Sequence, residues 1–298
     1  MIKVRIPATS ANIGAGFDSL GLALALYNYV SVEETESGLD IEILDDTKEF
    51  LATDERNLVY RSMKAVFDKV SYTPKGLHII LNNNIMVTRG LGSSSAGIVG
   101  GLIAGNELSG GKLSKDEILS MATELEGHPD NVAPAILGGL TVSVPCGQNV
   151  RYVKTDVNDD LKFAAFVPEF PLSTRKARSV LPKRVSLKDA VYNNGRSTLL
   201  MTSIMTGKYE NIRLAVGDRL HQQYRKKLIP HIDDLFSEAY RQGALGVYLS
   251  GAGPTVIAII NSKNTDFEYK LNKFLNKKMY KWHLHMLSAD NVGAEVFK

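Results

Sequence analysis

Hydrophobic and polar positions in the first half of the chain follow patterns typical of strands and of amphipathic helices. Four short apolar or alternating segments predict strands: Val4–Ala8, Tyr27–Glu33, Leu39–Ile43 and Gly76–Leu81. Asn82-Asn83-Asn84 predicts a turn that ends the fourth of them. Thr53-Asp54-Glu55 predicts the start of a helix. Its buried face would be formed by Leu58, Val59, Ser62, Met63, Val66, Phe67 and Val70.

Glycine and serine separate the next three predicted elements. These are a helix from the turn at Arg89–Ala96 to about Leu108, a helix from Ser114 to near Gly127, and a strand at Leu140–Val144. The second helix would begin with a capping box, Ser114-Lys115-Asp116-Glu117. Apolar periodicity then lapses over Pro145–Asp160, where Gly, Asn and Asp accumulate. This lapse predicts a boundary between two domains, residues 1–155 and residues 156–298.

Strands and helices also share the second half of the chain. Predicted strands are Phe163–Val167, Gly246–Ser250, Thr255–Ile260 and Trp282–Leu287. Predicted helices are Thr174–Leu181, further segments up to about Gln242, and Asp266–Asn276. The first of these helices would end before Pro182, which cannot continue it. The pattern indicates an α/β or an α+β protein and leaves the two classes open.

The composition indicates a chain that can bury a full core and argues against one class of partner. Hydrophobic residues make up 44% and charged residues 22% of the 298 residues. Lys and Arg number 35 against 32 Asp and Glu, so the net charge is only +3. Because no basic block interleaved with aromatic residues accompanies this slight charge, we expect no nucleic acid as partner.

The single cysteine and the short apolar runs limit the kinds of site and the cellular compartment that we expect. Because Cys146 is the single cysteine, a disulfide within the chain and a cysteine-rich zinc site are excluded. Its place after an apolar strand predicts a small buried residue. The runs around Gly21–Leu26 and Ile98–Ala104 are too short to span a membrane. Met1–Arg5 alternates like a strand and lacks the apolar run of a signal peptide. We therefore expect a cytoplasmic enzyme without a membrane partner.

One Gly/Ser-rich turn carries the clearest chemistry: Arg89-Gly90-Leu91-Gly92-Ser93-Ser94-Ser95-Ala96. Glycine lets a backbone approach an anion closely, and the first N–H groups of the following helix lack intrahelical partners. A helix start also carries partial positive charge, so the turn predicts a phosphate site. It is not a P-loop, because Gly-x-x-x-x-Gly-Lys-Ser/Thr occurs nowhere in the chain. A purely structural helix cap is the alternative.

Three further segments have side chains suited to a polar ligand. Pro7–Asp18 places Asn12 and Asp18 around a Gly-rich turn, although local Asx turns use the same residues. Leu249–Thr255 is a Gly-Pro turn between predicted strands, where a local crossover is the alternative. Glu124–Asn131 gathers carboxylates, an imidazole and an amide at a helix end. With a loop serine this segment suits Mg²⁺, which prefers oxygen ligands, whereas an ordinary helix C-cap is the alternative.

Pro7–Asp18, Arg89–Ala96 and Ser250–Pro254 resemble the three motifs of the GHMP kinases, named after galactokinase, homoserine kinase, mevalonate kinase and phosphomevalonate kinase. With Glu126–Ala135 and Ser173–Pro182, five motifs follow the family order and are most similar to the members that phosphorylate homoserine. The resemblance covers the whole chain. It implies a two-domain α+β fold, with an N-terminal half like ribosomal protein S5 domain 2 and a ferredoxin-like C-terminal half.

The resemblance also implies a site for ATP and Mg²⁺. The family pattern assigns the phosphates of ATP to Arg89, Gly90, Leu91, Gly92, Ser93, Ser94 and Ser95. It places Asn57 near the adenine. It assigns Mg²⁺ to Ser94 and Glu126, and another alignment would replace Glu126 by Glu124.

The pocket that the resemblance implies for homoserine is charged. Its residues would be Asn12, Asp18, His128, Asn131, Thr174, Arg178, Arg225 and Gly251. Homoserine is a zwitterion, so Asp18 suits its ammonium, while Arg178 and Arg225 suit its carboxylate. A neutral polyol offers these arginines no matching charge. A mevalonate-type kinase of the same family and a non-catalytic ATP-binding protein are the alternatives.

The implied reaction transfers the γ-phosphoryl group of Mg-ATP to the hydroxyl of homoserine, a step of threonine biosynthesis. Positioning and charge neutralisation carry most of phosphoryl transfer. We expect Asn131, Asp130 and Arg178 near the reacting groups and transfer without a strong protein base, whereas Asp130 as base is the alternative. The oligomeric state stays open, with a homodimer common in the family.

Overall fold

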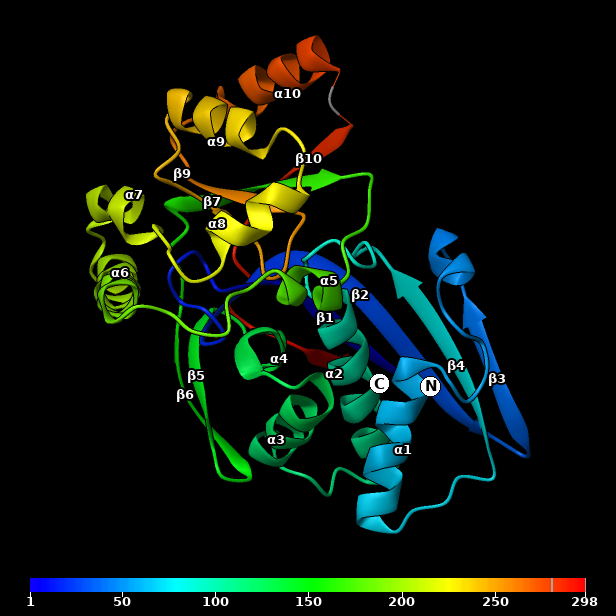
Figure 1. Ribbon diagram of the computed structural model, residues 1–298. Helices are drawn as coiled ribbons and strands as arrows, with labels where there is room; N and C mark the ends of the chain where they lie inside the picture. The colour runs from blue at the N-terminus through cyan, green and yellow to red at the C-terminus, as the bar shows by residue number, and fades with distance from the viewer. Residues whose placement is uncertain (280, 298) are drawn as a thin grey trace.

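The computed structural model describes residues 1–279 and 281–297, and the strands of these residues form two sheets (Figure 1). The first sheet has the order β11-β1-β2-β4-β3, and the β5–β6 hairpin extends it from β2. Its strands are β1 (Ile2–Ala11), β2 (Leu20–Thr35), β3 (Gly38–Ile43), β4 (Gly76–Asn83), β5 (Leu140–Cys146), β6 (Asn149–Thr155) and β11 (Glu295–Phe297). The pair β3–β4 is parallel, and the other pairs are antiparallel. Because β11 pairs with β1, the two chain ends lie together.

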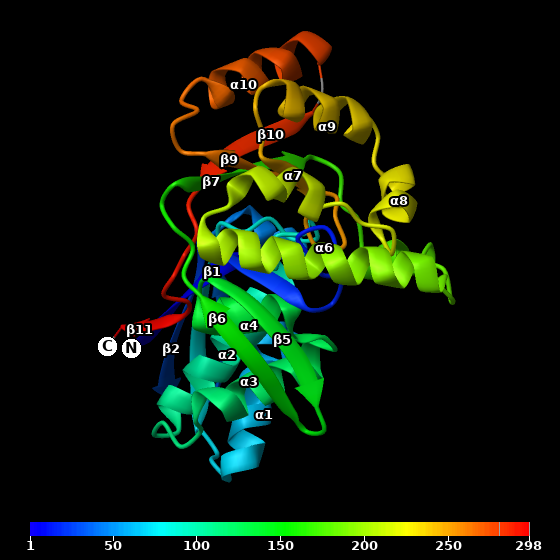
Figure 2. The same cartoon turned by 90° about the vertical axis from the view of Figure 1, so that its left-hand side faces the viewer.

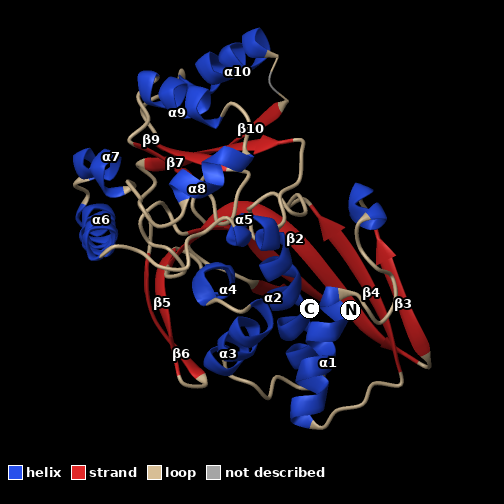
Figure 3. Cartoon of the chain, in the orientation of Figure 1, coloured by secondary structure: helices blue, strands red, loops and turns tan. Residues whose placement is uncertain are grey.

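Four helices pack on one face of this sheet (Figures 1 and 3). They are α1 (Leu58–Val70), α2 (Ser93–Leu108), α3 (Lys115–Glu126) and α4 (Pro129–Leu137). The apolar face of α1 meets α2, which in turn contacts β1 and β2. Fully buried Met63, Leu102 and Ile6 are part of the core between these layers. Burial of such apolar side chains is the main force that holds helices to a sheet.

The second sheet is antiparallel and has the order β10-β7-β9-β8. Its strands are β7 (Leu161–Pro168), β8 (Gly246–Leu249), β9 (Val256–Asn261) and β10 (Trp282–Leu287), and α9 (Ile232–Arg241) and α10 (Phe267–Lys278) cover its outer face (Figure 1). Short α5 (Thr174–Ser179), α7 (Ile212–Ala215) and α8 (Gln222–Arg225) and the long α6 (Leu187–Thr206) complete the second half. In Figure 2, α6 lies across the molecule above the β5–β6 hairpin. Two sheets whose strand pairs are antiparallel except for β3–β4, with α1–α4 on one face of the first and α9 and α10 on the outer face of the second, confirm the α+β class.

Several predicted boundaries are confirmed. The capping box of α3 is present, because Ser114 and Glu117 exchange side-chain and backbone hydrogen bonds, and α3 ends at Glu126 with Gly127 as its C-cap. The strand Trp282–Leu287 has its predicted bounds. The helix predicted to start at Thr53 begins instead at Leu58, because the Asn57 side chain caps it by accepting from Val59 N at 2.9 Å.

Other predictions need correction. Cys146 is exposed at the end of β5, so its expected burial was wrong. The helix α4 was not predicted; it begins at Pro129, where the missing N–H of proline costs no hydrogen bond. Within Pro145–Asp160, where apolar periodicity lapses and no strand was predicted, the structure has β6. The domain boundary at residue 155 stays a prediction. None of the helices in the described ranges is long and apolar enough to cross a membrane.

Phe267→Ala should destabilise the second half strongly, because Phe267 has no exposed surface and packs in the core beneath α10. We expect a loss of about 3–5 kcal/mol in urea unfolding, from lost burial and the cavity left behind. Tyr269→Ala on the same helix is the matched control, since Tyr269 is 70% exposed and should cost below about 0.5 kcal/mol. Equal losses in the two variants would contradict this packing.

Candidate active site

Hydrogen bonds tie together three chain segments that lie far apart in the sequence. Ser250 Oγ donates to Gly90 O at 2.5 Å and lies 2.8 Å from Ser10 Oγ. Gly251 N donates to Ala11 O at 3.0 Å. The end of β1, the turn before α2 and the β8–β9 turn therefore meet at one place, which we call the loop junction (Ser10–Asn12, Arg89–Gly90 and Ser250–Thr255). These are the three Gly-rich segments singled out in the sequence.

Gly92 lets the chain turn into α2 directly beside β1. Its φ of 72° is left-handed, and a Cβ there would lie 1.9 Å from Thr9 Oγ1. No side chain caps this helix start, so the first N–H groups, at Ser93 and Ser94, stay open toward a ligand. Leu91 N-terminal to it is buried in the core, where its side chain contributes packing.

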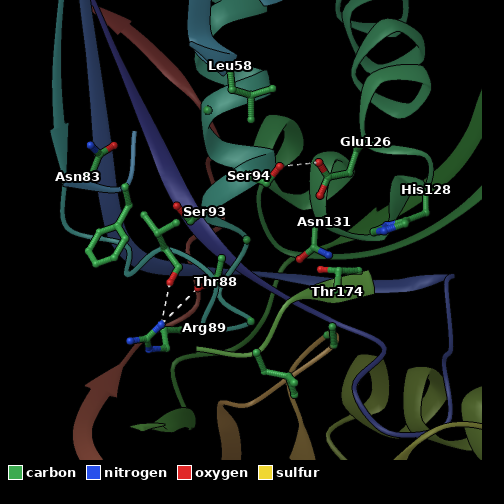
Figure 4. A pocket seen from close by; sticks show the side chains of 18 of the residues that line it. Leu58, Asn83, Thr88, Arg89, Ser93, Ser94, Glu126, His128, Asn131 and Thr174 are labelled. Carbon is green, nitrogen blue, oxygen red and sulfur yellow. Dashed lines mark hydrogen bonds between the residues drawn. The ribbon is translucent and has the colours of Figure 1, made fainter. Parts of the chain in front are cut away.

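A cavity of about 450 Å³ opens beside the loop junction. It brings together most of the predicted site residues: Asn12, Asp18, Asn57, Arg89, Gly90, Gly92, Ser93, Ser94, Glu126, His128, Asp130, Asn131, Thr174, Arg178, Arg225 and Gly251. Figure 4 shows Ser94 facing Glu126, with Asn131 and Thr174 close by. Two predicted residues, Leu91 and Ser95, do not line the cavity; both are buried.

Glu126 lies beside two serines in the first turn of α2. Its carboxylate accepts from Ser94 Oγ at 3.1 Å and from Ser95 Oγ at 2.9 Å. Glu124, the alternative ligand, is exposed on α3 and does not line the cavity. Within the described residues, no three His, Cys, Asp or Glu side chains form a metal-binding cluster. One carboxylate with hydroxyl groups suits Mg²⁺ that keeps waters and phosphate oxygens as its other ligands.

Asp18 and Arg178 pair across the cavity. The two carboxylate oxygens of Asp18 accept from Arg178 Nη2 at 2.9 Å and from Nη1 at 3.2 Å. Asn12 supports the pair, since its Oδ1 accepts from Asp18 N and its Nδ2 donates to Gly251 O, each at 2.9 Å. Both side chains are about one-third exposed, so solvent screens the pair and a zwitterion can share it.

Arg225 is almost completely buried, although it lines the cavity. Its Nη1 donates to Gly251 O at 2.9 Å, and its Nε donates to Ala177 O at 3.3 Å. Burial, with the neighbouring charge of Arg178, lowers the pKa of Arg225 to about 10. The guanidinium therefore remains charged at neutral pH and presents a cation to the cavity.

His128 and the first turn of α4 form the other polar wall. His128 Nδ1 lies 2.5 Å from Asp130 Oδ1. Asn131 Oδ1 accepts from Thr9 Oγ1 at 2.9 Å, which fixes the amide over the end of β1. Burial of His128 disfavours its charged form, but the hydrogen bond and charge of Asp130 outweigh it and raise the pKa of His128. At the pH where His128 is charged, Asp130 is its partner.

The far end of the cavity is more apolar than the sequence suggested. The Asn57 side chain binds backbone groups: its Nδ2 donates to Ala52 O at 2.6 Å, and its Oδ1 caps α1. Arg89 turns its guanidinium to Pro168 O and Glu169 O, so it lines this end without facing the serines. Phe50, 74% exposed, also lines it.

Sequence reasoning missed this apolar end and the support behind Arg225. The missed lining residues include Phe50, Leu51, Ala52, Asn83 and Thr88, two of which Figure 4 labels. Phe17 lies between cations, with its ring 5.7 Å from Arg178 and 5.3 Å from Arg225. A large aromatic between Gly16 and Asp18 in a polar turn was the available signal for Phe17. The apolar Phe50-Leu51-Ala52 run within a polar stretch was the signal for the apolar end.

Comparison with known proteins gives one family. Residues 57–139 match the GHMP kinases N terminal domain, and residues 200–277 match the GHMP kinases C terminal domain. The homoserine kinase of Clostridium botulinum (strain Eklund 17B / Type B) is 50% identical over 100% of this chain and 99% of its own length. That of Caldicellulosiruptor bescii is 50% identical over 100% and 97%. The crystal structure of homoserine kinase from Cytophaga hutchinsonii matches with a TM-score of 0.90 at 29% identity, over 99% of this chain and 97% of its own.

His128 should titrate above the ordinary histidine pKa of about 6.5, and Asp130→Asn should lower that midpoint. The contribution of the pair to folding stability is present below the ordinary pKa and lost as the pH rises through the raised one. NMR titration of the histidine rings measures the midpoint. His285, whose pKa burial and His283 lower, is the internal control and should not move. An unchanged His128 midpoint in Asp130→Asn would contradict the assigned cause.

Proposed function

The chain belongs to the GHMP kinase family, and on that premise we propose as its function the transfer of the γ-phosphoryl group of ATP to the side-chain hydroxyl of L-homoserine. The products are O-phospho-L-homoserine and ADP, a step of threonine biosynthesis. The observation that carries this function is 50% identity to homoserine kinases over the full length of the chain. The charged pocket supports it, since a mevalonate-type substrate offers no ammonium for Asp18. A non-catalytic binder would not need the Ser94–Glu126 pair.

The turn before α2 is our proposed phosphate site. Open N–H groups at Ser93 and Ser94, together with the partial positive charge of a 16-residue helix, favour phosphate oxygens there. Gly90 and Gly92 allow the backbone to approach closely. The apolar end with Phe50 and Leu58 would then hold the adenine, because nucleobases bury well against apolar side chains.

Ser94 and Glu126 are the residues that we propose to hold Mg²⁺. One carboxylate and one hydroxyl fit an ion that binds proteins through few ligands and nucleotides through their phosphates. When bound, Mg²⁺ neutralises charge on the β- and γ-phosphates. Without the ion, the two side chains satisfy each other at 3.1 Å.

Homoserine would lie between the phosphate site and the arginines. Its ammonium suits Asp18 and its carboxylate suits Arg178 and Arg225, so the substrate would share the existing Asp18–Arg178 pair. Asn131 and Thr174 line the same cavity, and Figure 4 shows both near Ser94. This arrangement directs the substrate hydroxyl toward the γ-phosphate.

The chemistry then rests on positioning. The hydroxyl oxygen forms a bond to the γ-phosphorus as the bond to the bridging oxygen breaks, and ADP leaves with that electron pair. Asp130 is 1% exposed and already bound to His128, which supports transfer without a strong protein base. The hydroxyl proton would pass to the transferred phosphoryl group or to water. A cytoplasmic location and a homodimer remain predictions.

ADP release in a coupled assay tests the function directly. With ATP and Mg²⁺, we expect kcat/KM with homoserine to be at least about 100-fold higher than with mevalonate or galactose, because these lack the ammonium that suits Asp18. It should be at least about 10-fold higher than with serine or threonine, which carry both charges but hold the hydroxyl one carbon closer to the α-carbon. Turnover with mevalonate or galactose instead would favour another kinase of the family. ATP binding without turnover on any of the five would favour the non-catalytic alternative.

Glu126→Ala should lower kcat by about 100-fold or more, because it removes the only carboxylate among the proposed magnesium ligands. Glu124→Ala, two residues earlier on α3, is the matched control and should retain wild-type turnover. Asp130→Asn should lose far less than Glu126→Ala, since Asp130 acts on His128 rather than as a base. A collapse of Asp130→Asn to background, in a folded protein that still binds ATP, would show that Asp130 is the base.

A further inference from the structure

His221 lies behind the cavity with both ring nitrogens engaged. The residue has no exposed surface and precedes α8. Its Nε2 lies 2.8 Å from Gly14 O, and its Nδ1 lies 3.2 Å from Arg225 Nη1. The ring therefore connects the backbone of the Pro7–Asp18 turn to the guanidinium that we assign to the substrate carboxylate.

These two contacts define one protonation state. A carbonyl oxygen only accepts hydrogen bonds, so Nε2 must carry a proton to bind Gly14 O. Arg225 Nη1 only donates, so Nδ1 must keep its lone pair. The neutral ring with its proton on Nε2 satisfies both partners, and neither the other tautomer nor the charged ring does.

The same contacts determine which donors Arg225 has left. Its Nη1 uses its two protons on His221 and Gly251 O, and its Nε uses one on Ala177 O. Its Nη2 has no hydrogen-bond partner in the part of the chain that the structure describes. Because Arg225 lines the cavity, Nη2 is the group available to an anion there.

We propose that His221, in its neutral form, is a positioning residue that holds Arg225 Nη2 toward the carboxylate of the amino-acid substrate. The proposal rests on the proposed function and goes beyond it, because it makes substrate affinity depend on a residue that never touches the substrate. The guanidinium is planar and rigid, so the contacts of Nε and Nη1 also fix the direction of Nη2. His221 Nδ1 is one of the two acceptors of Nη1, together with Gly251 O, and so helps to determine where Nη2 points.

The charged groups around His221 make this state dependent on pH. Asp218, on the segment before α8, lies 3.7 Å from Nε2, and Arg225 lies on the opposite side. Phe17 stacks on the ring at 5.2 Å, and the Arg178 guanidinium lies 5.7 Å from the Phe17 ring. The charge of Asp18 also acts on the imidazole and favours its protonated form. Burial is the largest effect and lowers the pKa of His221; Arg225 adds to it and Asp218 opposes it. At low pH, protonation of Nδ1 would place an N–H of a positively charged ring against the N–H of Arg225 Nη1. The affinity for homoserine should therefore decrease as the pH decreases.

Two amide substitutions separate the two contacts. His221→Asn places an oxygen where Nδ1 was, so it keeps the acceptor for Arg225 and loses the donor to Gly14. His221→Gln places an NH₂ where Nε2 was, so it keeps the donor and loses the acceptor. Neither amide titrates, so both variants should lose whatever acid dependence His221 gives to KM.

We expect His221→Gln to raise KM for homoserine about ten-fold, the size of one hydrogen bond to a charged group, and to leave KM for ATP within about two-fold. His221→Asn should stay within about three-fold of wild-type KM for homoserine. In the wild type, KM for homoserine should rise below the ordinary histidine pKa of about 6.5, and this rise should be absent from both variants. Thermal unfolding checks that the variants are folded, and calorimetric binding of homoserine measures the same affinities without turnover.

Three results would overturn the proposal. The first is a wild-type KM for homoserine in His221→Gln. The second is an equal increase of KM for homoserine and KM for ATP in the two variants, which is the result expected of a histidine with only a structural role. The third is an acid dependence that persists in both variants, which would assign it to His128 in the cavity. A wild type that binds homoserine but releases no ADP would instead count against the proposed function, and the calorimetric comparison would still judge His221.

Discussion

The site depends on the loop junction, where three turns separated by up to 240 residues share hydrogen bonds. Ser250 bonds both Ser10 and the Gly90 carbonyl, and Thr255 N donates to Arg89 O at 3.1 Å. Buried polar groups of this kind are costly unless all are satisfied, so the three turns order one another. This mutual order positions the start of α2, which would bind phosphate, against the β8–β9 turn, whose Gly251 carbonyl anchors Asn12 and Arg225.

The lining of the cavity differs between its two ends. Asp18, Arg178 and Arg225, which suit a zwitterion, lie together at one end, while Phe50 and its apolar neighbours line the other. Between them stand the serines and Glu126. A substrate with separated charges and a nucleotide with an apolar base match this division, and their reacting groups would meet at Ser94. Support for the charged end comes from behind, through Phe17, His221 and Asp218, none of which offers the substrate a direct contact in our proposal.

The resemblance to the GHMP kinases implied the α+β class and most of the residues that line the cavity. Sequence patterns by themselves predicted most strands and the three Gly-rich turns of the loop junction, because such turns are local signals. They failed where tertiary contacts decide. Asn57, rather than Thr53, caps α1, because the Asn57 side chain also donates to Ala52 O and so fixes the chain before the helix. Cys146 is exposed because β5 continues into a hairpin with β6 beyond the sheet. The direction of the Arg89 guanidinium depends on carbonyls at Pro168 and Glu169, some 80 residues away. His221 was missed because a lone histidine in a sequence does not disclose which acceptor and donor flank it.

A crystal structure with homoserine, Mg²⁺ and a non-hydrolysable ATP analogue tests the central claim most directly. The account predicts the triphosphate on the first turn of α2, the adenine at the Phe50 end, and the homoserine carboxylate on Arg225 Nη2 with its hydroxyl facing the γ-phosphate. A nucleotide bound away from the Gly90–Ser95 turn, or a homoserine whose carboxylate avoids Arg225, would contradict it.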